Sequence, residues 1–215
     1  MSAGPVLAVA LGGLSAEDAV RAAGASQANV FAVGIDALSG PGPGVIGALA
    51  RLGDVFVDAR LSGPAASVGL AARRLAAYGA RWVTVDGLAG EGTLRSAVAG
   101  VSVGRPGSGV VVAAVPEVAA GDLGTVGVSA SPGRLVSRIS SLAESCGAEG
   151  VLCAPGQLSV VGEVAPGVVR FAVLAHADSA AEAIDRGCDT LIFDADELVD
   201  VKAAIDRVRG SGGGG

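Results

Sequence analysis

The chain has 215 residues, of which 51% are hydrophobic and 35 are glycine, so it is long enough to bury a large core as one domain. The net charge of −6 and the pI near 4.7 argue against a nucleic-acid or acidic-membrane partner. Mean hydropathy is high, at +0.59, but a charge, a glycine or a proline interrupts every long apolar run, so we expect no membrane-spanning helix.

The cysteines indicate the redox compartment of the protein, and the two ends of the chain indicate the limits of its domain. Cys146, Cys153 and Cys188 are odd in number and form no Cys-x-x-Cys pair, which predicts a reducing cytoplasm, no disulfide framework and no metal site. The short apolar run at the N-terminus has no basic residues before it, so we interpret it as a strand and not as a signal peptide. Residues 1–209 are expected to form one domain, and the Gly/Ser-rich residues 210–215 a flexible tail.

Eight short apolar runs, rich in β-branched residues, predict strands. They span 5–11, 29–35, 54–61, 81–87, 109–115, 150–154, 168–175 and 189–195. The runs are nearly continuous and do not alternate with polar residues, which is typical of parallel strands covered on both faces.

Helical patterns lie between these strands, for example at 15–24, 64–79, 132–147 and 179–187. Ser15 is a candidate N-cap, and most of the patterns end in glycine, as a left-handed residue after a helix requires. Eight such units predict a (β/α)₈ TIM barrel, an α/β fold, with a doubly wound open sheet as the alternative.

In a TIM barrel, functional residues lie at the C-terminal ends of the strands. Those positions hold Gly12, Asp36, Asp58 with Arg60, Asp86, Glu117, Cys153, His176 and Asp194. Most of these residues are ionisable, although only 17% of the chain is charged. We therefore expect a small molecule to bind at this mouth, with no cofactor.

Three segments carry a resemblance to a known family. "VFVDARLSGPAASVGLAARRLAAYGARWVTVDG" resembles the third strand, catalytic loop, third helix and fourth strand of the orotidine 5′-monophosphate decarboxylase family. "GAEGVLCAPGQL" and "SAAEAIDRGCDTLIF" resemble its sixth strand and its last helix–strand unit. The resemblance implies a barrel that forms a homodimer through its mouth.

The chain departs from the family pattern where the chemistry lies. The family motif on the third strand is Asp-x-Lys-x-x-Asp, in which Asp58 matches the first acid, Arg60 replaces the lysine and Gly63 replaces the second acid. Gly12 and Ala32 stand where the resemblance implies an acid and a lysine. The departures also include a very short loop after the seventh strand, and Asp194-Ala195 in place of the phosphate-binding Gly-Arg pair.

The sequence contains one lysine, Lys202, which we expect in the last helix, outside the barrel. Arginine is not a general acid at neutral pH, because its pKa stays above about 12. An aspartate at the phosphate position would also repel a dianion. The sequence therefore predicts that the ancestral decarboxylation is lost.

Each candidate residue has two interpretations. Asp58 and Arg60 lie two apart on one strand and so share a face, either as an oriented guanidinium for a ligand or as a structural ion pair. Asp86 either extends that pair, with a catalytic role, or caps the following helix. His176 is a general base paired with Asp194, or a rim histidine bonded to the backbone. Cys153 contacts substrate, or is a small core residue.

Two functions remain open. The first is a lyase, isomerase or cyclase acting on a small, non-phosphorylated metabolite that Arg60, Asp194 and Cys153 would bind. Asp58, Asp86 and His176 would then move protons. The second is a catalytically inactive barrel that serves as a partner, regulatory or scaffold subunit.

Overall fold

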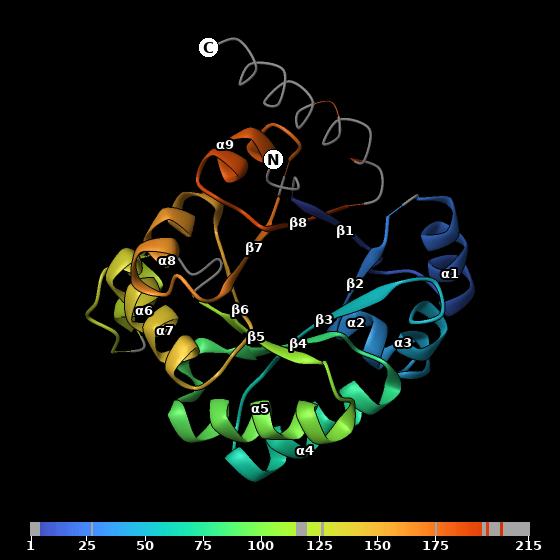
Figure 1. Ribbon diagram of the computed structural model, residues 1–215, viewed down its shortest axis with the longest axis horizontal. Helices are drawn as coiled ribbons and strands as arrows, with labels where there is room; N and C mark the ends of the chain where they lie inside the picture. The colour runs from blue at the N-terminus through green and yellow to red at the C-terminus, as the bar shows by residue number, and fades with distance from the viewer. Residues whose placement is uncertain are drawn as a thin grey trace.

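The computed structural model describes residues 5–26, 28–114, 120–125, 127–174, 176–194, 197 and 203. Eight parallel strands follow one another around a closed barrel, and β8 pairs with β1. Figure 1 looks into this barrel, with the helices arranged outside the ring of strands. The predicted TIM barrel is confirmed, and the closing pair of strands excludes the open sheet.

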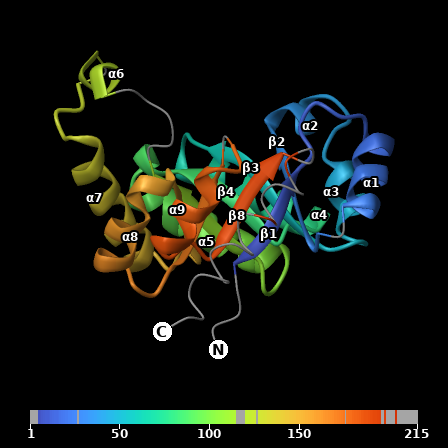
Figure 2. The same cartoon turned by 90° about the horizontal axis from the view of Figure 1, so that it is seen from above.

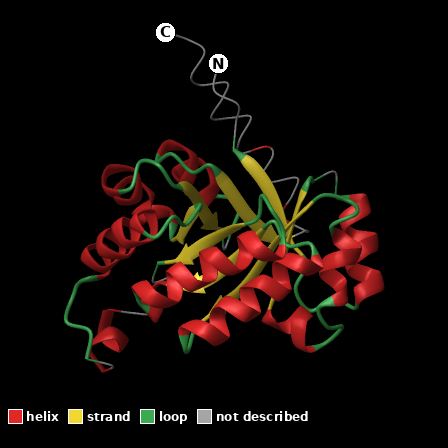
Figure 3. Cartoon of the chain, turned by 60° about the horizontal axis from the view of Figure 1, so that its bottom comes forward, coloured by secondary structure: helices red, strands yellow, loops and turns green. Residues whose placement is uncertain are grey.

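Each observed strand falls inside a predicted run, and helices (red in Figure 3) surround the strands (yellow). The strands are β1 Val6–Ala10, β2 Val30–Gly34, β3 Asp54–Leu61, β4 Trp82–Asp86, β5 Gly109–Ala113, β6 Gly150–Cys153, β7 Val169–Val173 and β8 Thr190–Asp194. The α-helices are α1 Ala16–Ala25, α2 Ile35–Ser39, α3 Gly44–Leu49, α4 Ala65–Tyr78, α5 Glu91–Gly104, α6 Ala120–Thr125, α7 Pro132–Ser145, α8 Leu158–Val164 and α9 Ser179–Asp185. Two 3₁₀ turns, η1 Gly87–Ala89 and η2 Pro155–Gln157, follow β4 and β6.

The helix ends follow the sequence signals. The Ser15 side chain accepts a hydrogen bond from the backbone N–H of Asp18 at 3.1 Å, which caps α1 as predicted. Gly79 ends α4 with a φ of 118°, a left-handed conformation that favours glycine because a Cβ is strained there.

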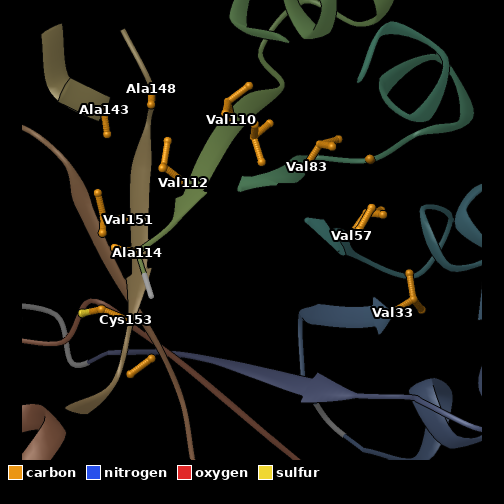
Figure 4. Packing of buried hydrophobic residues seen from close by; sticks show 14 of the residues in the cluster. Val33, Val57, Val83, Val110, Val112, Ala114, Ala143, Ala148, Val151 and Cys153 are labelled. Carbon is orange, nitrogen blue, oxygen red and sulfur yellow. The ribbon is translucent and has the colours of Figure 1, made fainter. Parts of the chain in front are cut away.

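Apolar side chains pack on both faces of the barrel wall. Val57, Val83, Val112 and Val151 lie in the larger core between strands and helices (Figure 4). A second cluster fills the barrel interior, where Phe56 and Trp82 both contact Phe171, with ring centroids 5.3 and 5.6 Å from it. The interior is therefore a packed core and not a channel.

The N-terminal end of the barrel is closed by a charged cluster. Glu149, just before β6, forms an ion pair with Arg81 and accepts a hydrogen bond from the Trp82 indole N–H at 2.9 Å. The Arg81 guanidinium also lies 4.5 Å from the centre of the Trp82 ring. This cluster is remote from the C-terminal strand ends and has a structural role.

Helices α4 and α5 lie side by side below β4 in Figure 1 and pack through glycines. A Cβ on Gly100 would collide with the backbone carbonyl of Gly69, and one on Gly104 would collide with that of Arg73. These collisions are with backbone atoms, which cannot rotate away as a side chain can. The two helices can therefore approach this closely only because glycine, which has no Cβ, occupies these positions.

We predict that Gly100→Ala destabilises the protein. Alanine gains up to about 1 kcal/mol of helix propensity, but overpacking against a backbone carbonyl costs about 1–3 kcal/mol. The net loss should lower the melting temperature, by roughly 2–4 °C for each kcal/mol in a domain of this size. Thermal unfolding followed by circular dichroism measures it.

Gly92→Ala is the matched control, because Gly92 lies in the same helix and a Cβ there would meet nothing within 4 Å. This variant should unfold at or above the wild-type temperature. Equal melting temperatures for Gly100→Ala and Gly92→Ala would contradict the packing argument.

Candidate functional site

The candidate site lies at the C-terminal ends of the strands, the end to which the β8 arrow points in Figure 2. The aromatic cluster of Phe56, Trp82 and Phe171 inside the barrel forms the floor of this site. Asp58 and Thr84 follow Phe56 and Trp82 by two residues on their strands, so their side chains face the same interior. The site is therefore built on rigid, buried strands.

Strand β3 bulges at the site. Val57 pairs with Val83 and Leu61 pairs with Val85, so residues 58–60 of β3 lie opposite Thr84 alone. Arg60 has a φ of 43° and is the one non-glycine residue with positive φ in the described part of the chain. Bulges of this kind redirect side chains and are frequent beside active sites.

Asp58, Arg60 and Thr84 are joined in a ring of hydrogen bonds. The backbone N–H of Arg60 donates to Thr84 Oγ1 at 2.7 Å, and the Thr84 hydroxyl donates to Asp58 Oδ1 at 2.9 Å. The Arg60 side chain closes the ring, with Nε 3.3 Å from Asp58 Oδ1 and Nη2 3.4 Å from Oδ2. The expectation that the two charges share a face is confirmed.

This ion pair is open to solvent on one side. The side chains of Arg60 and Asp58 are 38% and 25% exposed, whereas Thr84 is fully buried. Among the described residues Arg60 Nη1 has no hydrogen-bond partner, so one edge of the guanidinium can bind a ligand oxygen. Asp58 lies beside this edge, with its Oδ2 3.4 Å from Arg60 Nη2.

Two other acids at the rim hold backbone groups. The Asp86 carboxylate accepts a hydrogen bond from the Leu88 N–H at 2.8 Å and caps η1, which agrees with the capping interpretation in kind, although the capped element is a 3₁₀ turn and not the next helix. The Asp36 carboxylate accepts a hydrogen bond from the Gly13 N–H and bends back over Gly34. No hydrogen bond joins Asp86 to Asp58 or Arg60 in the described part of the protein.

His176 contacts a different acid from the one that we expected. Its Nδ1 lies 3.8 Å from Glu197 Oε1, and its side chain is 81% exposed. Asp194 ends β8 and is exposed, as the sequence predicts for the rim, but the structure gives no contact between it and His176. The expected His176–Asp194 pair is therefore replaced by His176 and Glu197.

Cys153 lies in the core at the end of β6, with 2% of its surface exposed, and belongs to the cluster between strands and helices. Burial, with a smaller effect from Cys188, raises its pKa to about 12, so the thiol stays protonated at neutral pH. This position fits a small core residue better than substrate contact. Glu117, Ala195, Lys202 and the tail at 210–215 lie outside the described residues.

Two residues that contact the candidate site residues were not expected from the sequence: Thr84, which bonds to Asp58, and Glu197, which lies beside His176. The signal for Thr84 was the single hydroxyl in the apolar run "WVTVD", at an inward position two residues after Trp82.

Among the described residues, no three His, Cys, Asp or Glu side chains are grouped to hold a metal ion. No helix in the same part of the chain is long and apolar enough to cross a membrane.

Comparison with known proteins identifies the family of this chain. No family model matches the sequence. The chain is 34% identical over 191 residues to an orotidine 5′-phosphate decarboxylase of Anaeromyxobacter sp. (strain K), covering 83% of each protein. It is 32% identical over 203 residues to that of Thermobifida fusca (strain YX), covering 87% of this chain and 86% of the relative.

Solved structures agree on the fold. The orotidine 5′-phosphate decarboxylase of Lactobacillus acidophilus superimposes with a TM-score of 0.81 at 20% identity, covering 97% of this chain and 98% of the other. That of Pyrococcus horikoshii OT3 gives 0.77 at 18% identity, covering 95% and 100%. With this level of identity over most of both sequences, the chain belongs to the orotidine 5′-phosphate decarboxylase family.

Proposed function

We propose that this barrel binds a small, non-phosphorylated carboxylate at its mouth and carries out lyase, isomerase or cyclase chemistry on it, without decarboxylating orotidine 5′-phosphate. The observation that carries the proposal is the Arg60 guanidinium, fixed by Asp58 and open on one edge. A guanidinium with a free edge binds a planar carboxylate or enolate well. Asp58 would move a proton to or from the bound ligand.

The inward residues at the ends of other strands favour a small ligand with an apolar body. Ala10, Ala32 and Ala113 occupy inward positions on β1, β2 and β5, and Val173 on β7 is 39% exposed. These side chains offer no charge and no hydrogen bond. Arg60 would thus bind one polar group of the ligand while the rest lies against aliphatic carbon.

Several features argue against a phosphorylated ligand. The sequence has no lysine other than Lys202, and exposed Asp194 stands at the end of β8. Rim acids Asp36 and Asp86 add negative charge near the mouth, and Arg60 is already paired with Asp58. A dianionic phosphate would be repelled there by Coulomb interactions of several kcal/mol at intermediate dielectric.

The second candidate is an inactive barrel that acts as a partner subunit. Two exposed apolar side chains at the mouth favour it: Ile35 at the start of α2 is 66% exposed, and Leu88 in η1 is 54% exposed. Such residues are commonly covered by another protein. They equally suit a homodimer formed through the mouths of two barrels, which we propose as the assembly of this chain.

We predict that the purified protein neither decarboxylates orotidine 5′-phosphate nor binds uridine 5′-monophosphate tightly. The reason is the combination of one lysine in the sequence and an aspartate at the end of β8. A spectrophotometric assay, with the decarboxylase of Thermobifida fusca as positive control, and calorimetry with the nucleotide measure both. Turnover, or micromolar binding, would refute the proposed loss of activity.

We predict that Arg60→Ala abolishes binding of carboxylates while leaving the fold nearly intact. The pair is partly exposed, so its loss should cost no more than about 1 kcal/mol. Calorimetry with the monoanions acetate, benzoate and orotate should show at least one ligand for the wild type and none for the variant. Arg170→Ala, which breaks the Arg170–Asp189 pair at the other end of the barrel, is the control and should bind as the wild type does.

If the protein is an inactive barrel, we expect a different result for carboxylate binding. If the ion pair only fills the mouth, the wild type itself should bind none of these carboxylates, and Arg60→Ala should differ from it in stability alone. No saturable binding by the wild type to any of the carboxylates would support that alternative.

We also predict a homodimer held mainly by the segments after β3 and β4. Light scattering at tens of micromolar should report twice the chain mass of 20.6 kDa. Leu88→Asp puts a charge into the expected interface and should shift the protein toward monomer, whereas Val103→Asp, at the far end of α5, should not. A monomeric wild type would remove this proposal.

A further inference from the structure

We propose that Thr84 is a positioning residue whose hydroxyl sets the direction in which Arg60 is presented at the mouth. The inference rests on the proposed function for its ligand, but the hydrogen bonds that carry it are independent of any reaction. Thr84 is the residue of β4 that faces the whole bulge of β3, and it bonds to both ends of that bulge.

The bulge creates a need for this hydroxyl. In a regular parallel pair, the backbone N–H groups of β3 would donate to carbonyls of β4. The register shift between Val57 and Leu61 interrupts that pattern, and the Arg60 N–H donates instead to Thr84 Oγ1 at 2.7 Å. A side-chain oxygen thus replaces the missing backbone acceptor at the residue with the strained φ of 43°.

The same hydroxyl orients the acid. It donates its own proton to Asp58 Oδ1 at 2.9 Å, and that oxygen also accepts from Arg60 Nε at 3.3 Å. Because Asp58 and the Arg60 backbone both depend on one buried oxygen, the guanidinium is fixed at its root and near its tip. A hydroxyl can both accept and donate here, which an apolar side chain of the same shape cannot do.

The burial of Thr84 makes this role specific. It is fully buried, so water cannot replace the lost hydroxyl from the solvent side. Its hydroxyl bonds to Asp58 and to the Arg60 backbone and does not reach the surface of the mouth, so it is a positioning residue and not a catalytic one.

The test compares Thr84→Val, which keeps the shape and removes the hydroxyl, with Thr84→Ser, which keeps the hydroxyl. Thr190→Val is the matched control, because Thr190 is a second buried threonine of the barrel wall, at the start of β8 and far from the bulge. The readouts are the amide hydrogen-exchange rate of Arg60 and the NMR signal of its side-chain Nε–H, measured on the full chain in all three variants.

In Thr84→Val we expect Arg60 amide exchange to accelerate roughly tenfold or more and its Nε–H signal to move or broaden. Thr84→Ser and Thr190→Val should keep both wild-type values. Affinity for the carboxylate found by calorimetry should fall in Thr84→Val and remain in Thr84→Ser.

A lowered melting temperature of Thr84→Val with unchanged Arg60 signals would mean a merely structural residue and would overturn the inference. Loss of both signals in Thr84→Ser as well would also overturn it, because the hydroxyl would then not be the cause. If the wild type binds no carboxylate, the proposed function fails, while the two Arg60 signals still decide the role of Thr84.

Discussion

The bulge of β3 is the constraint on which the candidate site depends. Three residues of β3 face one residue of β4, and the backbone at Arg60 takes a left-handed conformation that is unfavourable for a side chain of this size. Two hydrogen bonds of Thr84 hold that conformation: its hydroxyl oxygen accepts from the Arg60 backbone N–H, and its O–H donates to the Asp58 carboxylate. The bulge brings the Arg60 backbone N–H to the Thr84 hydroxyl, and the Arg60 side chain pairs with Asp58 beside it.

The rest of the barrel supports this local strain. Below the site, Phe56 and Phe171 pack with Trp82, whose indole N–H is bound by Glu149 at the opposite end. Outside the wall, α4 and α5, which follow the two strands of the site, approach each other closely through glycines. Both strands are therefore fixed from inside and outside, so a strained residue at their ends persists.

The sequence was sufficient to predict the fold, because continuous apolar runs and helices that end in glycine are signals that can be recognised locally in the chain. It also brought Asp58 and Arg60 onto one face, since residues two apart on a strand share a side. It could not reveal Thr84 as a partner, because the register shift is a property of two strands and a lone threonine in an apolar run carries no signal of it. His176 was matched to the wrong acid for a similar reason: Glu197 comes after the last strand, where sequence gives no direction for the chain.

The central claim is that Arg60 presents a guanidinium edge to a carboxylate at the mouth. The most direct measurement is a titration of the wild-type protein with orotate and benzoate, following the side-chain Nε–H signals of all arginines by NMR. The account predicts a saturable shift of the Arg60 signal, while those of Arg81 and Arg170 at the other end of the barrel stay in place. Equal, unsaturable shifts of all three signals, or none at Arg60, would contradict it.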